Sequence, residues 1–207
     1  IIPLLDELSP EARGIGAVNT VVLKDGKRIG HNTDCLGFAE GFRRGLKGVS
    51  VERVVQMGAG GAGAAVAHAL LSEGVQLLSI FDVDIRRAQD LADNLNQHFG
   101  VGRAVAGYDL PSAIAQADGL VNTTPMGMKK LPGMPVPVAL LRAELWVAEI
   151  VYFPLETELL RNARALGCRT LDGGNMAVFQ AVKAFELFSG VVPDARRMLE
   201  HFQSMND

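Results

Sequence analysis

The chain has 207 residues, of which 48% are hydrophobic and 21% charged, and its formal net charge is −3. This composition can form a core for one large or two small domains, and the net charge gives no electrostatic case for binding nucleic acid. No apolar run approaches the ~20 residues of a membrane span. Cys35 and Cys168 are isolated and no signal-peptide pattern opens the chain, so we expect a reducing compartment, by default the cytoplasm.

The first 47 residues do not follow the pattern of a nucleotide-binding unit. They predict a short helix, two strands and a longer helix, over Leu4–Arg13, Ala17–Leu23, Arg28–Asn32 and up to Leu46. Pro10 suits the first turn of the short helix and Gly14 its end. Asp25-Gly26 predicts a hairpin turn between the strands. Thr33 or Asp34 can cap the longer helix, and residues 47–50 resemble a linker.

The next segment is the most informative of the chain. A β-branched strand, Val51–Met57, is followed by Gly58-Ala59-Gly60-Gly61-Ala62-Gly63, an Ala/Leu-rich helix over Ala62–Ser72 and a second strand over Val75–Phe81. In this fingerprint Gly58 allows a tight turn, Gly60 lets the backbone approach a phosphate, and Gly63 lets the helix lie close to the strand. The free N–H groups at the helix start then face the pyrophosphate of a dinucleotide.

Asp82 follows the second strand, 19 residues after Gly63. A carboxylate at this spacing accepts hydrogen bonds from the ribose hydroxyls and repels a 2′-phosphate, which favours NAD over NADP. Arg86 and Arg87 complicate this interpretation because they could neutralise a phosphate. They could equally form the solvated face of the predicted helix Ile85–Gln97.

The remaining elements alternate between strands and helices. We expect strands near Gly102–Ala106, Gly119–Thr124, Glu144–Val151 and Arg169–Leu171, and helices over Pro111–Ala117, Arg161–Leu166, Asn175–Phe188 and Asp194–Met205. This alternation predicts an α/β fold with a doubly wound parallel sheet of the Rossmann type. The ligand should lie at the carboxyl ends of its first and fourth strands.

Two loops follow strands at that edge of the sheet. Asn122–Met128 carries an amide, two hydroxyls and two methionines but no charge, which suits packing against a nicotinamide ring. The alternative is an ordinary Pro/Gly-rich connection. The second loop, Ile150–Pro154, could bring Tyr152 toward a substrate.

Five blocks of this sequence together resemble the shikimate dehydrogenase family over nearly the whole chain. They are Gly16–Thr20, Asn32–Phe38, the glycine loop, Asn122–Gly127 and Asp172–Val182. The resemblance implies a dehydrogenase that passes hydride between a nicotinamide and a secondary alcohol of shikimate or quinate. It also implies a part in the shikimate pathway and aromatic amino acid biosynthesis.

The resemblance extends to the cofactor. NADP-dependent members typically carry an Asn-Arg-Thr-type segment after the second strand, where this chain has Phe81–Arg87. That departure, together with the run Val151–Leu160, resembles the NAD-dependent quinate/shikimate dehydrogenase branch. The residues expected to contact NAD are Gly58, Gly60, Gly61, Ala62, Gly63, Asp82, Arg87, Thr123, Pro125, Met126, Val151, Gly173 and Met176.

The same resemblance assigns the substrate site. Asp34 is the expected catalytic residue, which hydrogen-bonds a ring hydroxyl and pairs with a lysine; from the sequence alone it could as well be a helix cap. Asn19, Gln180 and Tyr152 match substrate-binding positions, and both amides can donate and accept. The four histidines lack metal-ligand spacing, so no metal is expected.

The family's catalytic lysine lies before the portion that this chain matches, and Lys24, Lys27 and Lys47 stand in no matching context. We therefore expect a fragment with residues 1–47 from the substrate domain, 48–172 as the NAD-binding domain and 173–207 as helices packing back on the substrate domain. If the 207 residues were the whole molecule, we would expect cofactor binding with weak or no turnover. An aminoshikimate-pathway dehydrogenase and a non-catalytic NAD-binding module are the alternatives, and a homodimer is possible.

Overall fold

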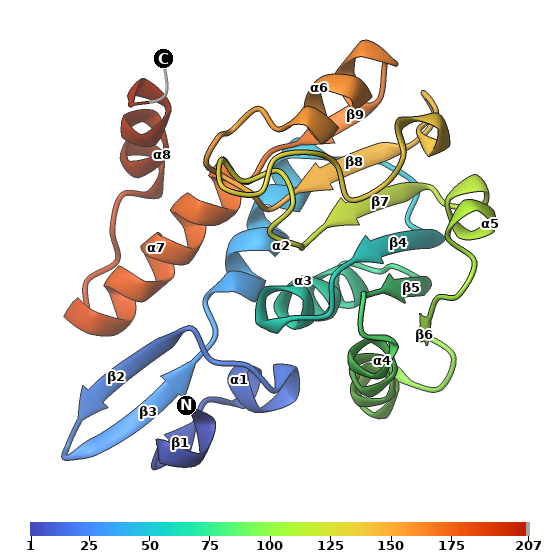
Figure 1. Cartoon of the computed structure of the whole chain (residues 1–207). Helices are drawn as coiled ribbons and strands as arrows, with labels where there is room; N and C mark the ends of the chain where they lie inside the picture. The colour runs from blue at the N-terminus through green and yellow to red at the C-terminus, as the bar shows by residue number, and fades with distance from the viewer. Residues whose placement is uncertain (206–207) are drawn as a thin grey trace.

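The larger of two β-sheets has six strands, all parallel (Figure 1). In this computed structural model, which describes residues 1–205, the strand order is β6 (Ala104–Ala106), β5 (Leu77–Phe81), β4 (Arg53–Met57), β7 (Gly119–Asn122), β8 (Trp146–Glu149) and β9 (Arg169–Leu171). The order reverses between the neighbours β4 and β7, which are the first and fourth strands of this sheet in chain order. The predicted doubly wound fold is confirmed, and its switch point lies at this pair.

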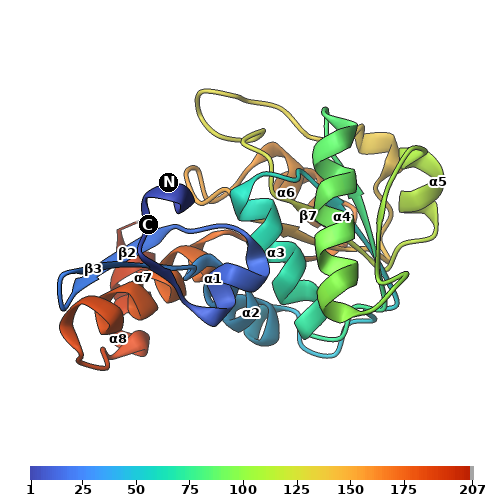
Figure 2. The same cartoon turned by 90° about the horizontal axis from the view of Figure 1, so that it is seen from below.

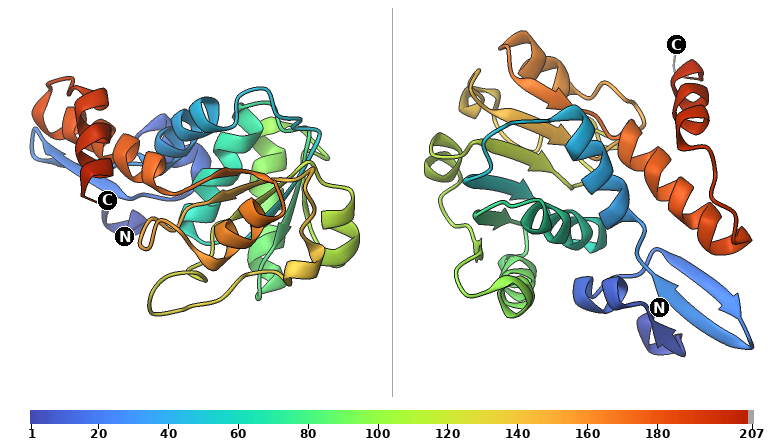
Figure 3. Two further views of the ribbon diagram at one scale, coloured as in Figure 1. Left: turned by 90° about the horizontal axis from the view of Figure 1, so that it is seen from above. Right: turned by 180° about the vertical axis from the view of Figure 1, so that it is seen from behind.

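Helices cover both faces of this sheet because successive strand residues alternate between two cores. Val54 packs with α2 (Asp34–Gly45), α3 (Gly61–Ser72) and α4 (Ile85–Phe99) on one face. Val55 packs on the other face with α5 (Leu110–Ala115), the 3₁₀ helix η2 (Val138–Leu140) and α6 (Glu158–Ala165). Figure 2 shows α3 and α4 on the face seen from below, and Figure 3 shows α2 running across the back.

The smaller sheet has the order β1-β3-β2 and lies beside the amino-terminal end of the chain (Figure 1). The strands β2 (Thr20–Lys24) and β3 (Lys27–His31) form the predicted antiparallel hairpin. Asp25 and Gly26 at its tip have φ of 53° and 75°, as a two-residue turn between twisted strands requires. The hairpin prediction is therefore confirmed.

The predicted helix over Leu4–Arg13 is wrong in its first half. This segment contains the 3₁₀ turn η1 (Ile2–Leu4) and then β1 (Glu7–Leu8), which pairs in parallel with β3. The helix α1 is Pro10–Ile15; Ser9 caps it, and Gly16 rather than Gly14 ends it with φ of 73°. Pairing with a strand more than twenty residues away overrides the local helical pattern.

Two helices complete the described chain, α7 (Gly174–Ser189) and α8 (Ala195–Ser204). The helix α7 crosses α2 closely, because a Cβ at Gly37 would lie 2.7 Å from the Met176 carbonyl oxygen and one at Gly41 would lie 3.1 Å from the Asn175 Cβ. The other predicted elements are present with ends shifted by a few residues. No helix among residues 1–205 is long and apolar enough to cross a membrane. The division into domains stays a prediction.

Candidate active site

The glycine loop connects β4 to α3 as the sequence predicts. Gly58 has φ of 100°, which favours glycine. A Cβ at Gly63 would lie 2.6 Å from the Gly58 carbonyl oxygen, so the helix indeed lies against the strand end. A Cβ at Gly60 would meet nothing within 4 Å, and no side chain caps the start of α3. This open backbone with free N–H groups fits the pyrophosphate of a dinucleotide.

Two polar side chains hold the loop from below. The fully buried Gln56 donates from Nε2 to the carbonyl oxygens of Gly58 and Gly63, at 2.9 and 3.0 Å. The Thr123 hydroxyl donates to the carbonyls of Met57 and Gly58, at 2.8 and 3.0 Å. Thr123, which we expected to contact the cofactor, therefore uses its hydroxyl to support the loop. The sequence analysis missed Gln56, whose signal is an amide inside an apolar strand.

Asp82 lies at the carboxyl end of β5 beside the loop. Its carboxylate accepts from the backbone N–H of Ala59 at 2.7 Å and from that of Asp84 at 2.9 Å. Asp84 caps α4, and its Oδ2 lies 3.8 Å from Nε of the exposed Arg87. A carboxylate has about four acceptor positions, so Asp82 retains capacity for ribose hydroxyls.

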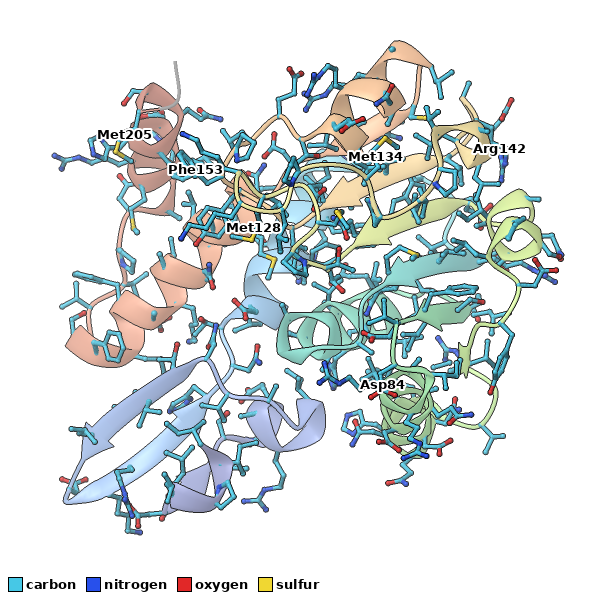
Figure 4. All side chains as sticks on the ribbon, in the orientation of Figure 1. Asp84, Met128, Met134, Arg142, Phe153 and Met205 are labelled. Atoms are coloured by element: carbon cyan, nitrogen blue, oxygen red, sulfur yellow. The ribbon has the colours of Figure 1, made fainter. Side chains whose placement is uncertain are left out.

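A groove follows this edge of the sheet from Asp82 to the loop after β8. Its first part, about 560 Å³, is lined by Gly58, Gly60, Asp82, Arg87, Thr123, Pro125 and Met126 among others. The second part, about 570 Å³, shares Thr123–Pro125 and extends to Met128, Val151, Tyr152 and Phe153. Figure 4 shows Met128 close to Phe153, both of which line this second part, with Asp84 well apart from them beside α4. One continuous groove therefore has room for both halves of a dinucleotide.

Asp34 and Asn19 lie together beside the small sheet. The Asn19 amide donates to the Thr33 hydroxyl at 3.0 Å and accepts from the Thr33 N–H at 2.9 Å. Asn32, not Thr33 or Asp34, accepts from a free helix N–H, that of Cys35. Burial raises the pKa of the Asp34 carboxyl, and hydrogen bonding from Asn19 offsets part of that rise. Asp34 is thus not used as a helix cap.

The first turns of α7 lie between the groove and the helix α2, which begins at Asp34. A Cβ at Gly173 would lie 2.5 Å from the Ile150 carbonyl oxygen and 2.6 Å from that of Val151, so α7 begins against the second loop. Met176 and Gln180 then contact Gly37, which lies three residues after Asp34. On the other side, a Cβ added at Gly61, at the start of α3, would lie 4.0 Å from the Ala17 Cβ. Tyr152 thus lines the groove, and Gln180 lies on the helix that packs against α2, the helix that begins at Asp34.

A buried acid that the sequence analysis left without a role ends β8. Glu149 is 2% exposed, and burial raises the pKa of its carboxyl to about 7. The signal for it is an acidic residue at the end of an otherwise apolar strand, Trp146–Glu149.

The histidines form one contact that their spacing does not predict. His68 on α3 and His98 on α4 have ring centroids 5.0 Å apart, and burial, with the nearby His98, lowers the pKa of His68. Among residues 1–205 no group of three or more His, Cys, Asp or Glu side chains could hold a metal ion.

The fold and the groove together define a dinucleotide-binding α/β protein of the Rossmann class. No protein-family model matches the chain. It is 60% identical to a shikimate dehydrogenase (NADP(+)) from Streptomyces avermitilis, over 96% of this chain and 69% of the relative. It is 53% identical to a quinate/shikimate dehydrogenase (NAD(+)) from Corynebacterium glutamicum, over 99% of this chain and 74% of the relative.

The solved structures agree. A quinate dehydrogenase from Corynebacterium glutamicum in complex with NAD superposes with a TM-score of 0.91 and 51% identity, covering 98% of this chain and 73% of that one. The chain belongs to the shikimate dehydrogenase family and is an oxidoreductase. The resemblance seen in the sequence is therefore confirmed, and the cofactor is NAD or NADP.

Proposed function

We propose that this protein transfers hydride between NAD and a secondary alcohol of shikimate or quinate, giving 3-dehydroshikimate or 3-dehydroquinate. The observation that carries the proposal is the continuous groove, with Asp82 at one end and Tyr152 at the other, next to the α2–α7 crossing that holds Asp34 and Gln180. The relatives are named for shikimate and for quinate/shikimate, which supports this substrate class.

The protein's own residues perform the binding and the proton transfer. NAD supplies the hydride acceptor when bound. Removing hydride from an alcohol carbon requires loss of the hydroxyl proton, so a group must hydrogen-bond that hydroxyl. Asp34 is that group in our proposal, since its carboxyl is half-buried and does not serve as a cap. Asn19, Gln180 and Tyr152 hold the other substituents of the ring, which fixes the orientation of the reacting carbon.

We further propose a preference for NAD. The relatives are split, one named for NADP at 60% identity and one for NAD at 53%, so the argument depends on local charge. Asp82 lines the groove two residues before Asp84, and Nε of Arg87 lies 3.8 Å from Oδ2 of Asp84. The two carboxylates repel a 2′-phosphate, and the Arg87 guanidinium offsets only part of that charge. The carboxylates can still accept hydrogen bonds from the ribose hydroxyls of NAD.

We further propose a location in the cytoplasm. Cys35 and Cys168 are free thiols, which fits a reducing cytoplasm. A homodimer stays a prediction, and sedimentation of the purified protein would test it.

The test is formation of NADH by the product of the complete gene, given NAD with shikimate and then quinate. Asp34→Asn should lower kcat/KM by about a hundredfold, in the range of general acid–base contributions. Asp25→Asn at the hairpin tip is the matched control, because asparagine tolerates positive φ there. Equal activity in the two variants would refute the role of Asp34. Binding of NADH without turnover on either acid would instead favour an aminoshikimate dehydrogenase or a non-catalytic module.

A further inference from the structure

Glu149 is a buried acid whose carboxylate joins three segments of the chain. Oε1 accepts from the Asn122 side-chain amide at 2.9 Å and from the Val151 N–H at 3.1 Å. Oε2 accepts from the same amide at 3.0 Å and from the Thr157 hydroxyl at 3.2 Å. These donors come from the end of β7, from the loop after β8, and from the start of α6.

Burial of an ionisable carboxyl without a cation is costly. Among residues 1–205 no Lys, Arg or His forms a salt bridge with Glu149. Every group within hydrogen-bonding distance of it is a donor, and a set of donors around two oxygens is what a carboxylate, rather than an amide, requires. A core that needed only packing would use an apolar residue here.

The first segment held by Glu149 is the loop after β7. Asn122 also donates to the Met126 carbonyl at 2.9 Å, and its own oxygen accepts from the N–H and hydroxyl of Thr124. Gly127 passes close to the acid, since a Cβ there would lie 3.5 Å from Oε2. Asn122, fixed by Glu149, therefore shapes residues 123–127.

The second segment is the loop after β8. The bond from Val151 N–H sets the direction in which the chain leaves the strand. Thr157, which also caps α6, fixes the far end of the same loop. Tyr152 and Phe153, between these two points, line the second part of the groove together with Thr123–Pro125 from the loop after β7.

We propose that Glu149 is a positioning residue for the nicotinamide half of the cofactor: its carboxylate sets the separation of the two loops that enclose that half of the groove. The proposal rests on the function proposed above. In the proposed function the adenosine half lies at Asp82, at the other end of the groove, and among the described residues no group of that surface donates a hydrogen bond to Glu149.

The test compares two ligands that share everything but the nicotinamide. NADH and ADP-ribose are titrated against wild-type protein and Glu149→Gln at pH 8, with NADH followed by its own fluorescence and ADP-ribose by calorimetry. Glutamine keeps the shape but must point an N–H₂ at one of the donors. We expect the Kd for NADH to rise about tenfold, equal to about 1.4 kcal/mol, and the Kd for ADP-ribose to change less than twofold.

The matched control is Glu144→Gln, an exposed acid near the start of the same strand, which should leave both constants unchanged. If Glu149→Gln folds poorly, a second pair of variants at Thr157 tests the same proposal. Thr157→Val removes one donor and should weaken NADH selectively, whereas Thr157→Ser keeps the hydroxyl and should restore wild-type affinity.

The possible outcomes separate the positioning role of Glu149 from the proposed function. A parallel rise for both ligands, or no change for NADH, would overturn the positioning role while leaving the proposed function intact. Failure of the wild-type protein to bind NADH would refute the proposed function itself, and the positioning role with it.

Discussion

Replacement of Gly63 by alanine tests whether the close approach of α3 to β4 shapes the glycine loop. The added Cβ would lie 2.6 Å from the Gly58 carbonyl oxygen and 2.9 Å from the Thr123 hydroxyl oxygen. Ordinary contact begins near 3.4 Å, so the helix or the loop must move by about 0.8 Å. Overpacking of this kind costs ~1–3 kcal/mol, and the better helix propensity of alanine returns ~1 kcal/mol.

We therefore expect Gly63→Ala to lower the free energy of unfolding by about 1 kcal/mol, within the range left by these two opposing effects. We also expect a Kd for NADH about tenfold higher, since one hydrogen bond to a charged phosphate is worth ~1.5 kcal/mol or more. Urea unfolding and fluorescence titration measure the two quantities. For stability alone, Gly61→Ala is the control, because its Cβ would meet only Ala17 at 4.0 Å. Unchanged stability and affinity in Gly63→Ala would refute the steric argument.

Three other predictions follow from particular contacts. The pKa of the Glu149 carboxyl is about 7 in the folded protein, against a usual 4.5. Its ionisation therefore lowers the free energy of unfolding as pH rises from 4.5 to 7, by at most about 3 kcal/mol. Urea unfolding across this range should show a flatter pH dependence in Glu149→Gln, and an identical slope in the two proteins would contradict the raised pKa. Gly37→Ala would place a Cβ 2.7 Å from the Met176 carbonyl oxygen, so we expect the free energy of unfolding to fall by about 1–3 kcal/mol. We also expect a lower kcat, and wild-type turnover in a steady-state assay would refute this expectation. Asp84→Ser keeps the cap of α4 and removes the charge facing Arg87, so titration should show NADPH binding several-fold tighter with NADH nearly unchanged; no gain for NADPH would argue against the electrostatic account.

The Rossmann part of the fold could be predicted because its signals are local. The glycine fingerprint, the β-branched strands and Asp82 each lie within one βαβ unit, and the alternation of strands and helices fixes the handedness of the crossovers. The roles of Gly58 and Gly63 follow from backbone geometry alone, and the structure has both as expected.

The features that were missed depend on contacts between distant segments. The strand β1 exists because Glu7 and Leu8 pair with β3, a partner that the local pattern cannot indicate. Glu149 is a buried acid whose partner Asn122 lies 27 residues away on the neighbouring strand, so the pairing depends on the strand order. Gln56 is the exception, because its partners Gly58 and Gly63 lie in the loop and helix that follow its own strand. Proximity of Asp34 to Gln180 likewise depends on the close crossing of α2 and α7, which two glycines permit.

The most direct test of the central claim compares NAD with NADP in one assay. The product of the complete gene is given shikimate, then quinate, with each cofactor in turn, and reduction of the nicotinamide is followed by absorbance. We predict that kcat/KM is higher with NAD than with NADP on at least one of the two acids, because the carboxylates of Asp82 and the neighbouring Asp84 would repel a 2′-phosphate. Higher kcat/KM with NADP on both acids would contradict the account.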